Sequence, residues 1–199
     1  MLAHILPLFA FALAGSMTPG PNNLLLAASG IRFGFKATIP HMIGVHMGYS
    51  TLLIAVGLGL GTVFEHWPIL QDILRIGGTG YILYLAWRIL RGWSLSQPEA
   101  NDAARPIGFL EAALFQFINP KGVIMAITMF ATYAMPGAGV LANIALIVGV
   151  AAVVNVLSVT TWAGFGAAMQ GLAGREPAAR IIRWVLALMT VASVAMLYI

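Results

Sequence analysis

Two proline breaks inside apolar runs constrain this chain more than any other feature of its sequence. Residues 18–23 read Thr-Pro-Gly-Pro-Asn-Asn and residues 119–122 read Asn-Pro-Lys-Gly, and each motif interrupts a run that is otherwise apolar enough to cross a membrane. Proline has no backbone N–H and clashes with the carbonyl one turn earlier, so each motif must break a helix. In hydrocarbon, a broken backbone persists only where protein or a water-filled cavity satisfies it. Paired breaks of this kind are typical of the central site of a membrane transporter.

The composition indicates that the bilayer is the solvent of this chain. Of its 199 residues 60% are hydrophobic and 8% are charged, whereas about a quarter of the residues in a soluble domain are charged. The mean hydropathy is +0.93. There is no cysteine, which excludes disulfides, thiolate metal sites and a cysteine nucleophile. No loop holds a dense run of basic residues, so nucleic acid is not an expected partner.

Six segments are long enough to span a bilayer, for which roughly 20 apolar residues are needed. They lie at about 2–31, 37–64, 69–89, 107–134 and 140–172, and the sixth runs from the basic stretch after 175 to residue 199. Basic residues gather in alternate loops: Arg32 and Lys36, then Arg88, Arg91 and Arg105, then Arg175, Arg180 and Arg183. The positive-inside rule places these loops in the cytoplasm and both termini outside.

Three spans in each half make the second half enter the membrane in the opposite sense. The sequence therefore predicts an all-α membrane protein with six transmembrane helices. They form two inverted three-helix repeats, at 1–95 and 107–199, joined by a cytoplasmic linker at 96–106. The first helix of each repeat is expected to be broken at its proline motif. Within the second segment, Gly44-x-x-x-Gly48 has a spacing that lets two helices approach closely.

Each break resembles the end of one half-helix and the start of another. Thr18 and Asn119 are suitable N-cap residues, and the proline that follows each is favoured at the first helical position. A helix start carries unpaired N–H groups and about half a positive charge. Lys121 adds a full charge beside the second start, so this place suits a carboxylate.

Groups that accept hydrogen bonds are expected at the same place. Pro19 and Pro120 each free a carbonyl about one turn earlier, near Gly15 and Gln116. Together with the side chains of Asn22, Asn23, Asn119 and Gln116, these carbonyls can receive an ammonium group. A site that takes both charges suits a zwitterion such as an amino acid.

Two interpretations of Lys121 stay open. It lies about 14 residues from each end of its segment, or ~20 Å at the rise of an α-helix, which is too deep for easy snorkelling. A lysine at that depth is functional by default. The structural alternative is a lysine bonded to carbonyls that only holds the broken helix. The prolines themselves can also be plain kinks.

Three further titratable residues fall in or near the spans. Glu111 lies about one turn inside its segment, and is either an interfacial charge or a proton carrier. His41 and His46 are five residues apart, or about 140° around a helix, so they cannot hold one metal ion from one face. We expect His41 at the interface, while His46 lies in mid-span and can face a cavity.

The motifs taken together resemble those of one family. Three motifs occur in the order and spacing of the lysine exporter and homoserine/threonine exporter (LysE/RhtB) family. They are residues 18–22 (Thr-Pro-Gly-Pro-Asn), residues 77–87 (Gly-Gly-Thr-Gly-Tyr-Ile-Leu-Tyr-Leu-Ala-Trp), and Phe109-Leu110 leading to residues 119–121 (Asn-Pro-Lys). The resemblance covers nearly the whole chain. It implies a bacterial inner-membrane protein that exports amino acids or close derivatives by using the proton gradient. The matching signature positions are Pro19, Gly20, Pro21, Asn22, Asn119, Pro120 and Lys121.

The expected function is therefore amino-acid export by alternating access around the paired breaks. The alternative is a metal-ion or other small-metabolite exporter of the wider superfamily. A membrane enzyme is a weaker alternative, because no catalytic motif surrounds Lys121 or His46. A non-transporting assembly subunit is also weaker, because the small size and Gly44-x-x-x-Gly48 permit it but do not indicate it. No cofactor is expected, and the small size favours a homodimer. The predicted substrate site comprises Thr18, Pro19, Gly20, Pro21, Asn22, Asn119, Pro120 and Lys121, with Glu111 and His46 as candidates for proton coupling.

Overall fold

The computed structural model describes residues 2–61, 66–90, 105–173, 175 and 177–195, and the regular structure in these ranges is helical throughout. The predicted all-α class is therefore confirmed for this part of the chain. The helices are α1 (Leu2–Met17), α2 (Pro21–Phe33), α3 (Phe35–Ala55), η1 (Val56–Leu60), α5 (Pro68–Leu90), α6 (Phe109–Ile118), α7 (Pro120–Tyr133), α8 (Val140–Ala173) and α9 (Ala178–Ala195). Most of the predicted linker at 96–106, Arg91 and the ends of the second and sixth predicted segments lie outside the described residues.

Both predicted breaks are present. Residues 18–20 separate α1 from α2, and Asn119 alone separates α6 from α7, which are bent by 64°. Proline occupies the first position of each second half-helix, Pro21 in α2 and Pro120 in α7, where its missing N–H costs no helical hydrogen bond.

The predicted N-cap is right at the second break and wrong at the first. Asn119 precedes α7, but the residue that precedes α2 is Gly20, with extended backbone (φ −169°), and not Thr18. The Thr18 hydroxyl instead donates to the carbonyl of Gly15 at 2.7 Å, which closes the end of α1. The extended backbone at Gly20 follows from Pro21, because a proline disfavours helical geometry in the residue before it.

Three helical stretches in the described part of the chain are long and apolar enough to cross a bilayer: Phe35–Leu60, Val140–Leu172 and Ala178–Ala195. The bent pair α6–α7 makes a fourth if it is one span. These helices agree with a multi-pass membrane protein. The count falls short of the six predicted spans, and the six-span inverted repeat stays a prediction.

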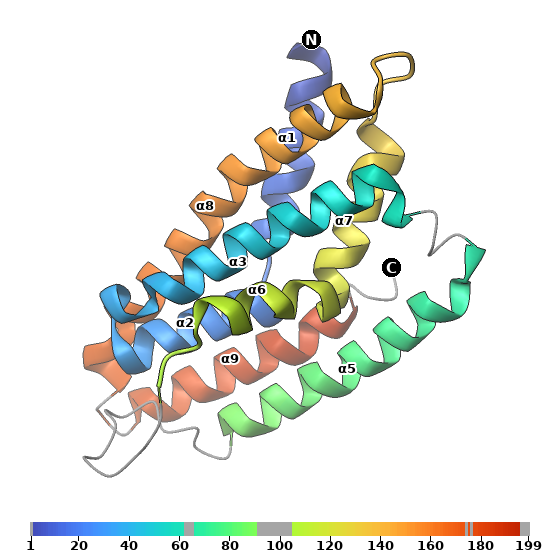
Figure 1. The fold of residues 1–199 in the computed structure, drawn as a ribbon. Helices are drawn as coiled ribbons and strands as arrows, with labels where there is room; N and C mark the ends of the chain where they lie inside the picture. The colour runs from blue at the N-terminus through green and yellow to red at the C-terminus, as the bar shows by residue number, and fades with distance from the viewer. Residues whose placement is uncertain (1, 62–65, 91–104, 174, 176, 196–199) are drawn as a thin grey trace.

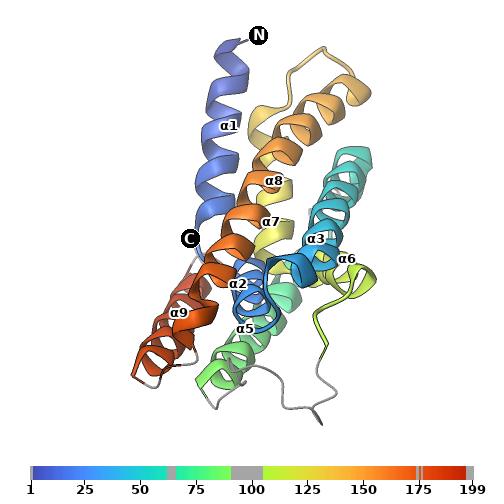
Figure 2. The same ribbon diagram turned by 90° about the vertical axis from the view of Figure 1, so that its left-hand side faces the viewer.

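Helix α8 is the element around which the others pack. It contacts α1, α2 and α3, while α6 lies along α3 and α5 lies along α9 (Figures 1 and 2). The α3–α6 contact depends on Gly44 and Gly48. A Cβ atom on Gly48 would lie 2.5 Å from the carbonyl oxygen of Ala113, and one on Gly44 would overlap the carbonyl of Phe109. The close approach predicted for Gly44-x-x-x-Gly48 is thus confirmed.

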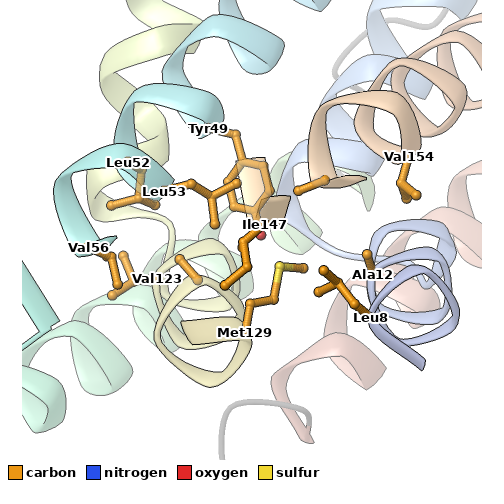
Figure 3. Close-up of a cluster of buried hydrophobic side chains, with 12 residues drawn as sticks. Leu8, Ala12, Tyr49, Leu52, Leu53, Val56, Val123, Met129, Ile147 and Val154 are labelled. Atoms are coloured by element: carbon orange, nitrogen blue, oxygen red, sulfur yellow. The ribbon is translucent and has the colours of Figure 1, made fainter. Parts of the chain in front are cut away.

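Two clusters of buried apolar side chains lie on either side of a polar region in the middle of the molecule. The α1–α7 cluster joins α1, α3, α7 and α8 (Figure 3) and contains Leu8, Ala12, Tyr49, Leu52, Leu53, Val56, Val123, Ala126, Met129, Ile147, Ala151 and Val154. The smaller α2–α6 cluster contains Leu26, Val45, Ala112 and Val159. Along α8, the polar residues Asn155 and Ser158 lie between the two clusters.

Candidate functional site

A cavity of about 50 Å³ lies where the two breaks meet α3 and α8. Five of the predicted site residues line it: Gly20, Pro21, Asn22, Asn119 and Lys121. Its other lining residues are Gly15, Ser16, Asn23, Val45, Tyr49, Gln116, Gly122, Met125, Asn155 and Ser158. Thr18 and Pro19 contact Lys121. Pro120 packs under Gly78 of α5, where a Cβ atom would overlap the proline ring.

Lys121 joins the two breaks. Its ammonium group donates to the carbonyl of Thr18 at 2.9 Å, to the hydroxyl of the same residue at 2.9 Å and to the carbonyl of Pro19 at 3.3 Å. The lysine reaches these oxygens by passing over Gly20, where a Cβ atom would lie 2.9 Å from the lysine Cδ. The bracing role considered for Lys121 is therefore present in this conformation, with the positive charge held at the end of α1.

A residue of the second half-helix at the first break contacts the second break, as Lys121 contacts the first. Asn22 has the same position in α2 as Lys121 has in α7, directly after the first-position proline. Its amide exchanges two hydrogen bonds with Gln116 of α6: Asn22 Nδ2 donates at 2.5 Å and Gln116 Nε2 donates at 3.1 Å. The second residue of each second half-helix thus binds the opposite break: Asn22 binds α6, and Lys121 binds the residues that follow α1. Gln116 also donates to the carbonyl of Ala112 at 2.8 Å.

Carbonyl groups at the first break are already bonded within the protein. Asn23 Nδ2 donates to the carbonyls of Ser16 (2.7 Å) and Thr18 (2.8 Å), and the Ser158 hydroxyl donates to the Ser16 carbonyl at 2.6 Å. The carbonyl of Gly15, expected to be free because of Pro19, accepts from the Thr18 hydroxyl. That expectation was wrong because a hydroxyl side chain replaced the missing backbone donor.

Two buried polar atoms of residues that line the cavity have no hydrogen-bond partner among the described residues. They are the hydroxyl oxygen of Tyr49 and Oδ1 of Asn119, in residues that are 6% and 3% exposed. Leaving such a group unpaired in a protein interior costs about 1–3 kcal/mol. The predicted substrate site did not include Tyr49. The available signal was its mid-span position, since tyrosine in membrane proteins is otherwise enriched at the interfaces.

The candidate proton carriers lie in different surroundings. His46 Nδ1 is 3.2 Å from Oδ1 of Asn155, which lines the central cavity. Glu111 is 58% exposed and pairs with Arg105 at 3.6 Å. It lines a separate cavity of about 420 Å³ together with His41. His41 is 1% exposed, because packing that the sequence pattern does not reveal covers its side chain. Its position at the membrane interface stays a prediction.

The site as it stands is too small for a metabolite. Pockets that hold small-molecule ligands usually measure about 300–1,000 Å³, and 50 Å³ has room for only a few water molecules. Each of the two apolar clusters contributes one residue to its lining, Tyr49 and Val45. In the described part of the chain, no three His, Cys, Asp or Glu side chains lie close enough together to hold a metal ion.

Comparison with known proteins agrees with this architecture. The family model of the LysE type translocators matches residues 13–199. The cysteine/O-acetylserine efflux protein of Salmonella typhimurium is 30% identical over 131 residues, which are 64% of this chain and 64% of that protein, just under two thirds of its length. The protein of the same name from Escherichia coli K12 is 27% identical over 167 residues, 82% of this chain and 83% of that protein.

No solved structure matches the chain. The efflux activity named for both relatives, together with the apolar helices, points to a membrane transporter rather than an enzyme. The family model covers far more than half of the sequence. The chain belongs to the LysE type translocator family.

Proposed function

We propose that this protein exports amino acids or close derivatives across the bacterial inner membrane, driven by the proton gradient. The observation that carries the proposal is the central cavity built from both proline breaks and joined across them by Lys121. Unpaired N–H groups at the starts of α2 and α7 and the lysine charge favour a carboxylate. Amide and carbonyl oxygens from the same two breaks favour an ammonium group.

The substrate-binding role belongs to the residues of the two breaks. Lys121 exchanges its contacts with Thr18 and Pro19 for the substrate carboxylate, so its ammonium group has hydrogen-bond acceptors both before and after the substrate binds. Asn22 and Gln116 can open their amide pair in the same way. The proposed binding residues are Thr18, Pro19, Gly20, Pro21, Asn22, Asn119, Pro120 and Lys121.

Transport requires that the two apolar clusters open in turn. In the proposed cycle, the α1–α7 cluster, which contributes Tyr49 to the lining, is the barrier toward the end of the molecule that carries the N-terminus (Figure 1). The α2–α6 cluster, which contributes Val45, is the barrier on the other side. We assign six spans in two inverted repeats to the whole chain, with both termini in the periplasm, and we propose that two copies form a homodimer. The cavity of about 50 Å³ then corresponds to a closed state between the inward-open and outward-open forms.

Uptake into inside-out vesicles tests the proposed function. The first substrates to try are L-cysteine and O-acetyl-L-serine, because the relatives are named for them. Vesicles that contain the protein are expected to accumulate one of these, or another amino acid in a panel, when their lumen is acidified, and to lose this uptake when a protonophore is added. Vesicles from cells that lack the protein are the control. Uptake of a metal ion or another metabolite, with none of any amino acid, would contradict the proposal.

The coupling proton is assigned to His46, because Asn155 connects this imidazole to the cavity. His46→Gln keeps a hydrogen-bonding side chain but cannot carry a proton, so it is expected to abolish proton-driven uptake. Exchange of labelled for unlabelled substrate, which needs no proton, should persist. Glu111→Gln is the matched control and should leave uptake within a factor of about two, since an exposed ion pair contributes little. Loss of coupling in the Glu111 variant alone would move the role to that residue.

A further inference from the structure

The central cavity has two hydrogen-bonding groups that the protein itself does not use. Most polar side chains that line the cavity are already bonded internally: Asn22, Asn23, Gln116, Lys121, Asn155 and Ser158. The hydroxyl of Tyr49 and Oδ1 of Asn119 have no partner within the described chain, although both residues are more than nine-tenths buried.

We propose that the Tyr49 hydroxyl and the Asn119 side-chain carbonyl bind the polar groups of the transported molecule, and that Tyr49 helps to set substrate specificity. This inference rests on the proposed amino-acid export. It adds Tyr49 of α3 to the site, a residue that lies outside both proline motifs.

The chemistry of the two atoms defines what each one binds. Asn119 Oδ1 is an amide oxygen and only accepts, so it needs a donor, which the ammonium group of an amino acid supplies. The Tyr49 hydroxyl both donates and accepts, and it fits a carbonyl, hydroxyl or carboxylate oxygen of the same molecule. A ligand with a donor at one end and an oxygen at the other satisfies both atoms at once. A purely apolar ligand satisfies neither atom, and a bare cation leaves the Tyr49 hydroxyl without an acceptor for its proton.

Asn119 is free to serve a ligand because its side chain has no structural task at the helix start. It is the residue before α7, yet its side chain makes no capping hydrogen bond. The usual role of asparagine at this position is to accept from the first turn of the helix. Here Oδ1 has no partner in the described part of the chain, and the residue lines the cavity.

Tyr49 also connects the cavity to the α1–α7 cluster. Its ring enters that cluster from α3 (Figure 3), and the same residue lines the cavity. A ligand that draws the hydroxyl to itself therefore acts on the packing of the cluster that must open. Ligand binding at Tyr49 is thus expected to couple occupancy of the cavity to the packing of the α1–α7 cluster.

Tyr49→Phe tests the proposal because it removes one oxygen and keeps the ring that packs in the cluster. Purified wild type and variant are compared in proteoliposomes with labelled O-acetyl-L-serine and L-cysteine. The variant is expected to raise KM about tenfold, since one hydrogen bond is lost from the bound state. Its melting temperature without substrate should equal or exceed that of wild type, because an unpaired buried group is removed. The rise in melting temperature that substrate gives wild type should be reduced.

Tyr133→Phe is the matched control. Tyr133 of α7 also packs against the α1–α7 cluster but does not line the cavity, so this variant should keep the wild-type KM. An unchanged KM in Tyr49→Phe, as expected if the hydroxyl only binds trapped water, would overturn the proposal. A lower melting temperature of that variant without substrate would also overturn it, by showing that the hydroxyl has a structural bond. If wild type neither moves nor binds any amino acid, the proposed function itself fails.

A pair of substitutions at Asn119 tests the second atom. Asn119→Asp keeps an accepting oxygen at the same place, whereas Asn119→Ala removes it. The alanine variant is expected to raise KM about tenfold, and the aspartate variant should bind a ligand with an ammonium group at least as well as the alanine variant. Equal KM values in both variants and wild type would remove Asn119 from the proposal.

Discussion

Lys121→Met is expected to reduce amino-acid efflux about 100-fold, which corresponds to about 2.7 kcal/mol. Methionine fills nearly the same space but cannot donate to the oxygens of Thr18 and Pro19, which now hold the ammonium group. It also removes the charge proposed to receive the substrate carboxylate. The measurement is efflux from preloaded cells, with the amount of inserted protein determined in the same samples.

Lys36→Met is the matched control, because Lys36 is the other lysine of the chain and is exposed at the start of α3. It should export at the wild-type rate. Thr18→Val, which removes one of the three oxygens around the ammonium group and keeps the carbonyl, should have an intermediate effect. Normal export by Lys121→Met would show that this lysine only holds the broken helices together and does not bind substrate. The binding site would then centre on Asn22 and Asn119.

Gly48→Leu is expected to prevent accumulation of folded protein. A Cβ atom at this position would lie 2.5 Å from the carbonyl oxygen and 2.6 Å from the Cα of Ala113, and backbone atoms of a packed helix cannot move aside as the end of a side chain can. Overpacking usually costs about 1–3 kcal/mol, and separating α3 from α6 should exceed that range. Size-exclusion profiles and melting temperatures of the protein in detergent measure the effect.

Gly149→Leu provides the comparison, because no atom lies within 4 Å of a Cβ placed on this exposed glycine of α8. This variant should accumulate and melt as wild type does. If Gly48→Leu behaves in the same way, the α3–α6 contact contributes little to folding and the small-residue motif has another purpose.

Local chemistry was enough to predict the breaks and most helix boundaries. Proline acts on its own helix, so the two interruptions and the positions of Pro21 and Pro120 follow from a few neighbouring residues. The spacing of Gly44 and Gly48 likewise predicted a close contact, although not that α6 makes it. At the first break two prolines compete, and the sequence did not indicate that the helix starts at the second of them.

Contacts between residues far apart in the sequence could not be predicted in this way. Lys121 and Thr18 are 103 positions apart, and Asn22 and Gln116 are 94 apart. A proline motif predicts that a carbonyl one turn earlier will lose its backbone N–H donor. It does not predict that a threonine hydroxyl will donate to that carbonyl instead. Tyr49 was missed for the same reason, since an unpaired hydroxyl is a property of its surroundings and not of the residue.

The two contacts across the breaks also make the breaks depend on each other. Asn22 and Lys121 hold the same place after the first-position prolines of α2 and α7. Asn22 reaches Gln116 of α6, and Lys121 reaches Thr18 and Pro19 of the first break. Each break therefore supplies a hydrogen-bonding partner to the other. Residues 1–95 expressed without residues 107–199 would lack the partners of both breaks, so the two parts of the chain are expected to fold only together.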